Sequence, residues 1–116
     1  MMEVQVNIDC TDAETLRAFY CEALGYKPHS EAGAYTSCVP GGDAIGPKIV
    51  FQQVPETKLV KNRMHFDLVV DDIETEAARF VALGASRVSE KPVGEHGCHW
   101  IVMHDPEGNE LCLCDS

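Results

Sequence analysis

The sequence predicts an α+β protein made of two repeated βαβββ modules, and three observations lead to this class. The first is an internal repeat, in which residues 4–15 (VQVNIDCTDAET) align with residues 64–75 (MHFDLVVDDIET) at a spacing of 60. The second is a strand-like pattern that passes into a helical pattern in both copies. The third is a set of glycine-containing turns between the short strand-like segments behind each helix. Together they indicate two copies of one supersecondary unit, with helices on one face of each sheet.

The repeat also pairs polar side chains on the first strand of each copy. At the spacing of 60, Gln5 pairs with His65 and Asn7 pairs with Asp67. Because a pseudo-symmetric protein brings such strands together, these four side chains are the first candidates for a functional site. The alignment rests on Asp12 and Asp72, Glu14 and Glu74, Thr15 and Thr75, Ala18 and Ala78, and on Leu24-Gly25 against Leu83-Gly84, where the spacing falls to 59.

Length and charge limit the possible classes. A chain of 116 residues is expected to form one domain, 1–116, with module one at 1–54, a connector at 55–62 and module two at 63–116. The net charge of −10 argues against nucleic acid and anionic membrane as partners, and it favours either a cationic ligand or simply a solvated acidic surface. Since no membrane-length apolar run and no signal-peptide pattern occur, we expect a cytoplasmic protein.

The six cysteines are expected to be reduced thiols. They form no CxxC pair and no zinc-ribbon spacing. Cys112 and Cys114 are two residues apart in an expected strand, so their side chains share one face. They could bind a metal together, or they could pack as small hydrophobic side chains.

The sequence of the first module predicts a strand, a helix and three further strands. Residues 3–10 alternate apolar and polar side chains, which is typical of a half-buried strand. Thr11 and Glu14 form a capping box before a helix that Gly25 ends. Strands are then expected near 26–30, 33–39 and 47–54.

The second module repeats this order. A strand at 63–70 leads to a helix at 72–83, opened by Asp71 and Glu74 and stopped by Gly84. The Asp105-Pro106-Glu107-Gly108 segment predicts a turn. The later strands are expected near 85–91, 98–104 and 109–114.

These motifs resemble the vicinal oxygen chelate superfamily, which contains glyoxalases, bleomycin-resistance proteins and extradiol dioxygenases. The resemblance covers nearly the whole chain and is carried by FYCEALG at 19–25, HFDLVVD at 65–71 and HDPEGNE at 104–110. The segments KNRMH at 61–65 and HWIVM at 99–103 look most like the glyoxalase-like bacterial branch. The resemblance implies a U-shaped half-barrel sheet with the helices outside, a small-molecule ligand and a homodimer.

The resemblance also implies four metal-ligand positions, usually His or Gln, Glu, His and Glu. The first-strand positions fall on Gln5 and His65, and the last-strand position of module two falls on Cys112. Counting back 60 residues from Cys112 gives Gln52, or Phe51 after a one-residue slip. Both positions that normally supply carboxylates are therefore changed. A hard divalent ion is held in part by carboxylate ligands, and glyoxalase chemistry also needs a carboxylate base next to the metal. The standard metal site is therefore expected to be degenerate, and the cofactor is left undetermined.

Several residues carry alternative readings. His65 is either a hydrogen-bonded structural histidine or a functional one, and Asp67 either orients it or pairs with a surface arginine. Either face of strand 98–104 could line the site, one carrying His99 and Ile101 and the other Trp100, Val102 and His104. His99 is favoured, because Glu95-x-Gly97-x-His99 echoes Glu31-x-Gly33-x-Tyr35 and a polar aromatic side chain suits a pocket wall. A non-standard metal site would use His65, His99, Asp67 and Cys112, and the alternative is a metal-free polar pocket.

The sequence therefore predicts a small-molecule-binding protein with a degenerate metal site, which could sequester a cationic compound. The alternative is a lyase or isomerase-type enzyme in which His65 acts as base, with Asp67 orienting it, or as ligand of a non-standard metal site. A third reading is a scaffold that only dimerises. The expected ligand-binding residues are Gln5, Asn7, Gln52, His65, Asp67, His99 and Cys112.

Overall fold

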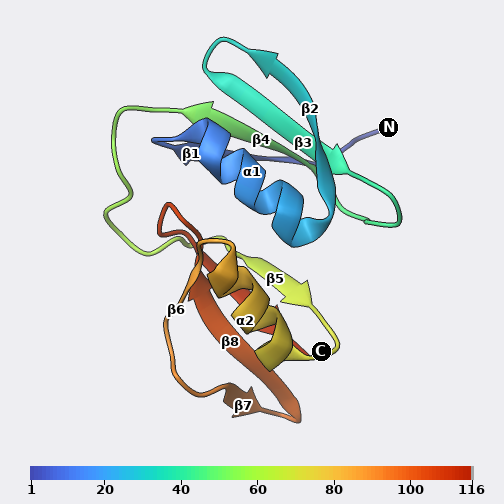
Figure 1. The fold of residues 1–116 in the computed structure, drawn as a ribbon, viewed down its shortest axis with the longest axis vertical. Helices are drawn as coiled ribbons and strands as arrows, with labels where there is room; N and C mark the ends of the chain where they lie inside the picture. The colour runs from blue at the N-terminus through green and yellow to red at the C-terminus, as the bar shows by residue number, and fades with distance from the viewer. Residues whose placement is uncertain (116) are drawn as a thin grey trace. The chain divides into compact units, whose positions relative to one another are not determined.

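The computed structural model describes residues 1–115 and divides the chain into two compact units, Met1–Lys58 and Leu59–Ser116. Each unit is one sheet with one helix lying across one of its faces (Figure 1). The predicted α+β class with repeated modules is confirmed, and the boundary between the units falls inside the predicted connector. No helix in residues 1–115 is long and apolar enough to cross a membrane.

The first unit is a four-stranded sheet in the order β1-β4-β3-β2. The first and last strands are neighbours and run parallel, whereas the other pairs are antiparallel. A parallel pair needs a long crossover, and here the crossover carries the helix. The elements are β1 (Gln5–Cys10), α1 (Ala13–Leu24), β2 (Tyr26–Ala32), β3 (Tyr35–Pro40) and β4 (Lys48–Gln53).

The second unit repeats this plan in the order β5-β9-β8-β6, and β5 and β9 are again parallel. The strand predicted at 85–91 is reduced to the short β6, and a further strand that was not predicted, β7, follows it at 93–95; both pair with β8. The chain leaves the sheet between them because the Arg87 guanidinium binds the carbonyls of Ser89 and Glu90, and Pro92 has no N–H for the ladder. The elements are β5 (Phe66–Val69), α2 (Ile73–Ala82), β6 (Ser86–Arg87), β7 (Val93–Glu95), β8 (Cys98–His104) and β9 (Glu110–Cys114).

Each core lies between a helix and one face of its sheet. In the first unit the Tyr20 ring of α1 stacks on Phe51 of β4, with 5.8 Å between centroids. In the second unit Phe80 of α2 is buried with alternate residues of β8 and β9, among them Ile101 and Leu111. Because side chains alternate along a strand, the residues between these core positions project from the opposite face, here called the helix-distal face.

Both helices begin with an aspartate cap. The Asp12 and Asp72 carboxylates accept the backbone N–H of Thr15 and Thr75, each at 3.1 Å. The predicted caps, Thr11 and Asp71, are wrong by one residue, since each comes directly before the observed cap. Each observed aspartate lies three residues before the threonine whose N–H it accepts. The predicted stop at Gly25 is confirmed, since this residue has a φ of 70° in the left-handed region.

Replacing both caps, Asp12→Asn with Asp72→Asn, should reduce the pH dependence of stability in acid. Hydrogen bonds from Thr15 and Thr75 hold the pKa of each cap below its ordinary value. The charged carboxylates of the caps therefore stabilise the fold fully above about pH 4, and this stabilisation is lost as pH falls through the lowered pKa. In urea unfolding, the wild type should have a higher free energy of unfolding than the double variant at pH 7, and this difference should close towards about pH 2. Asp43→Asn serves as control, and a gap that persists in acid would contradict this account.

Candidate functional site

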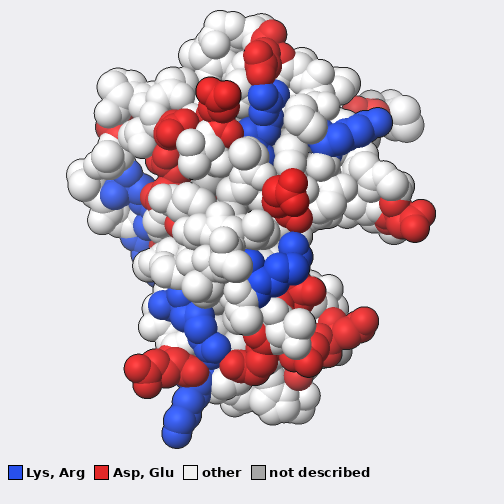
Figure 2. All heavy atoms as spheres, viewed as in Figure 1, with Lys and Arg blue, Asp and Glu red and all other residues white. Residues whose placement is uncertain are grey.

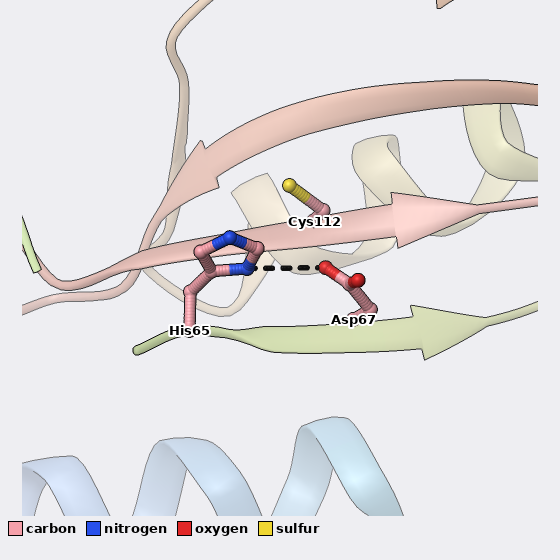
Figure 3. Close-up of side chains that lie close together, drawn as sticks. All are labelled: His65, Asp67 and Cys112. Carbon is pink, nitrogen blue, oxygen red and sulfur yellow. Dashed lines mark ion pairs between the residues drawn. The ribbon is translucent and has the colours of Figure 1, made fainter. Parts of the chain in front are cut away.

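The helix-distal face of the second sheet brings three of the predicted site residues together. Asp67 of β5 lies directly beside Cys112 of β9 in the parallel register. Their neighbours Leu111 and Leu113 are fully buried on the helix side, so Asp67 and Cys112 project from the opposite face. His65 lies just before β5, two residues from Asp67, and its ring turns towards the same place (Figure 3).

His65 and Asp67 lie close enough for an ion pair, which forms when the ring is protonated. The distance between His65 Nδ1 and Asp67 Oδ1 is 3.1 Å, with side-chain exposures of 38% and 59%. A carboxylate this close to Nδ1 favours the neutral tautomer that carries its proton on Nδ1 and leaves Nε2 unprotonated. Such an arrangement orients the ring and makes Nε2 available as a base or as a metal ligand.

The Cys112 thiol completes the cluster. One donor atom from each of His65, Asp67 and Cys112 lies within 4.8 Å of the other two. Burial, followed by the negative charge of Asp67, raises the pKa of Cys112 to about 11, and Lys61 opposes this shift. The thiol is therefore protonated at neutral pH and is no nucleophile there.

The segment before His65 is anchored to the start of β9. The backbone N–H of Asn62 donates to the Glu110 carboxylate at 2.9 Å, and the Asn62 amide donates to Asn109 Oδ1 at 3.1 Å. Glu110 is buried, and its contact with Asn62 helps to fix the approach of the chain to β5. The sequence had not indicated this role for Asn62, since the contact joins residues 48 positions apart.

His99 does not join this cluster. The antiparallel register places Val102 beside Cys112, so the helix-distal side chains of β8 include Trp100 and His104 rather than His99. His99 projects from the other face, with its Nδ1 at 3.0 Å from Asp115 Oδ2 and its backbone N–H bound to the same carboxylate at 2.8 Å. The structure therefore separates His99 from the three residues that it was expected to accompany.

The first sheet arranges its candidates differently. Gln5, Asn7 and Gln52 all lie on the helix-distal face, but Asn7 is beside Val50, and Gln52 is beside Asp9. Val50 therefore occupies the place that Cys112 has in the second unit. Gln5 is beside Lys48, four residues from Gln52, which corresponds to about 13 Å along the strand. Gln5 and Gln52 are thus not neighbours on this face.

A family model described as a glyoxalase-like domain matches residues 5–114. The chain belongs to this family. The family match and the fold place it in the glyoxalase/bleomycin resistance/dioxygenase superfamily, as the sequence motifs predicted. A search of curated proteins by sequence finds no significant match.

Solved structures of this glyoxalase-like fold match over nearly the whole chain. A family enzyme from Burkholderia phytofirmans is 21% identical, with a TM-score of 0.74 over 95% of this chain and 94% of that one. The bleomycin resistance determinant of transposon Tn5 is 18% identical, with a TM-score of 0.68 over 100% and 98%. A superfamily member from Sphaerobacter thermophilus is 17% identical, with a TM-score of 0.72 over 98% and 96%. At these identities the likeness concerns the fold.

The donor groups at the candidate metal-ligand positions do not fit a hard divalent ion. Mg²⁺ and similar ions require several oxygen ligands in near-octahedral geometry. The donors gathered in the second unit are one imidazole, one carboxylate and one thiol, and the carboxamides of Gln5 and Gln52 lie apart from one another. The donor set thus lacks the two carboxylates of the usual site.

Asp67→Asn should make Cys112 more reactive. Because the Asp67 charge raises the pKa of the thiol, its removal should lower that pKa and enlarge the thiolate fraction, about tenfold per pKa unit. Iodoacetamide labelling at pH 8, read by mass spectrometry of the Cys112 peptide, should be faster in this variant. Asp71→Asn is the matched control. Equal labelling rates in the wild type and in Asp67→Asn would show that Asp67 does not control the thiol.

Proposed function

We propose that this chain is a small-molecule-binding protein whose ligand contacts the helix-distal face of β5 and β9 at His65 and Asp67. The observation that carries the proposal is the accessible His65–Asp67 pair, 3.1 Å apart, on the face away from the core. A polar pair of this kind offers an anionic acceptor and a ring nitrogen within reach of one small molecule. The binding does not depend on the standard metal site of the superfamily, because that donor set is degenerate here.

Charge favours a cationic ligand. The chain has a net charge of −10, and the carboxylate of Asp67 is more than half exposed. On the face shown in Figure 2, acidic side chains are scattered among basic and uncharged ones, so the attraction comes from the whole surface and not from one patch. The similarity in fold to a bleomycin resistance determinant supports the same ligand class, a cationic compound that is sequestered.

A cytoplasmic homodimer is part of this proposal. None of the six cysteines forms a disulfide within the described part of the chain, which suits a reducing compartment. The dimer is carried over from the superfamily resemblance. Light scattering at micromolar concentration gives the mass directly, and a species of 12.7 kDa would remove the dimer from the proposal.

Calorimetry with bleomycin, a cationic glycopeptide, tests the ligand class. Binding should be detectable in the wild type and should weaken about tenfold in Asp67→Asn, because a charge-assisted contact is lost. Asp71→Asn, which changes the net charge equally but lies in the turn before α2, should keep the wild-type affinity. Absence of binding in the wild type, or equal weakening in both variants, would count against a cation site at Asp67.

The His65–Asp67 contact also favours a second candidate, an enzyme of the lyase or isomerase type. With its Nδ1 proton held by Asp67, His65 can take a proton at Nε2 from carbon next to a carbonyl group. This would suit isomerisation of a small oxygenated substrate.

His65→Ala should abolish such an activity without unfolding the protein. Deuterium exchange into simple α-hydroxyketones, followed by NMR, should be faster with the wild type than with His65→Ala. His29→Ala, which removes an exposed histidine from β2, is the control. If His65→Ala and the wild type exchange at one rate, His65 is not a base for these compounds.

A further inference from the structure

We propose that Glu110 and Asn109 are positioning residues for His65. Both bind Asn62, and through this residue they fix the short loop that presents the His65 ring to Asp67. This role deepens the proposed function and rests on it, because the ligand is assigned to the same His65–Asp67 pair. It belongs to residues that act on the ring through the backbone and not through contact with the ligand.

Apolar packing does not hold the segment that leads to His65. The side chains of Leu59, Val60 and Met64 are largely in solvent, with exposed fractions of 91%, 78% and 89%. His65 itself lies outside the strand, since β5 begins at Phe66. A segment that buries so little apolar surface does not repay the entropy of ordering it, and it depends on polar contacts to keep one conformation.

Asn62 supplies these polar contacts. Its backbone N–H donates to Glu110 Oε1 at 2.9 Å, and its side-chain amide donates to Asn109 Oδ1 at 3.1 Å. The two acceptors are consecutive residues at the start of β9, so they hold both the backbone and the side chain of Asn62 against one end of the sheet.

The Asn62 contact closes a short loop before β5. Asn62 and Phe66 are four residues apart, a span of about 13 Å in an extended chain. Their partners, Glu110 and Leu111, are nevertheless consecutive on β9. The backbone takes up the excess length by bending between Asn62 and Phe66. His65 is the last residue of this loop, so the Asn62 contact sets the point from which its ring extends.

The turn between β8 and β9 holds the acceptors of Asn62 in place. Asp105 is buried, and its carboxylate accepts the backbone N–H of Glu107 at 2.8 Å and that of Asn109 at 2.9 Å. It also accepts Asn109 Nδ2 at 3.0 Å, which leaves Asn109 Oδ1 to accept the amide of Asn62. Glu110, the next residue, is buried as well. A buried polar network of this kind is rigid and can therefore order an exposed segment.

Loss of the Glu110 carboxylate should move the His65 ring without touching it. In Glu110→Ala the backbone N–H of Asn62 turns to water, and the loop gains alternative conformations. His65 Nδ1 then spends less time beside Asp67. Glu110→Gln keeps an acceptor oxygen at the same place and should keep the ring in position.

A two-bond ¹H–¹⁵N NMR spectrum of the histidine rings in the full-length protein tests this role. Glu110→Ala should shift the neutral His65 ring from Nδ1–H towards Nε2–H, and Glu110→Gln should retain the wild-type balance. Asn62→Ala, which removes only the side-chain donor, should give a smaller shift in the same direction. Phe80→Leu shrinks a buried side chain on the helix side of the same unit, so it should lower stability in urea and leave the tautomer unchanged.

Calorimetry with bleomycin measures the effect on ligand binding. Glu110→Ala should weaken binding about fivefold, which corresponds to the net value of about one hydrogen bond. In the Asp67→Asn background the same change should have almost no effect, because Glu110 acts through the His65–Asp67 pair.

Three results would overturn the positioning role: an unchanged His65 tautomer in Glu110→Ala and Asn62→Ala, an equal shift in Phe80→Leu, or equal weakening of binding by Glu110→Ala in both backgrounds. The NMR spectra contain no ligand, so they stand apart from the proposed function. Bleomycin binding with an unmoved tautomer would leave the proposed function and remove the role of Glu110. A moved tautomer without bleomycin binding would do the reverse.

Discussion

The parallel pairing of the first and last strands within each unit is the constraint on which the site depends. It follows from a crossover that carries a helix, and the helix covers one face of the sheet. The register of that pairing then decides which residues are neighbours on the other face: Asp67 beside Cys112 in the second unit, and Asn7 beside Val50 in the first. A shift of the register by one residue would turn Cys112 towards the core and separate it from Asp67.

The two units share one scaffold but carry different functional groups on their helix-distal faces. The helix-distal face of the first unit carries carboxamides at Gln5, Asn7 and Gln52, none of which titrates. The second unit has an imidazole and a carboxylate in contact, with a thiol beside them. The titratable groups of the paired positions are therefore concentrated in one unit.

Much of the fold could be predicted because it depends on local patterns. The repeat, the alternation in β1 and the glycine after α1 determined the class and the order of elements. Three features depended on distant contacts instead: the break between β6 and β7, the side of β8 on which His99 lies, and the partner of Cys112 in the repeat. The turn at Asp105–Gly108 could have resolved the side of β8, because a short hairpin fixes its register and so places Val102 beside Cys112. Counting at a fixed spacing of 60 could not identify the partner of Cys112 in the first unit, since loop lengths differ between the units.

The proposed function depends on His65 and Asp67 behaving as one polar pair on the helix-distal face. The most direct measurement is a two-bond ¹H–¹⁵N NMR spectrum of the histidine rings, recorded for the wild type and for Asp67→Asn. The neutral ring of His65 should carry its proton on Nδ1 in the wild type, and Asp67→Asn should shift the tautomer balance towards Nε2–H. A wild-type ring protonated mainly on Nε2, and unchanged in Asp67→Asn, would contradict this expectation.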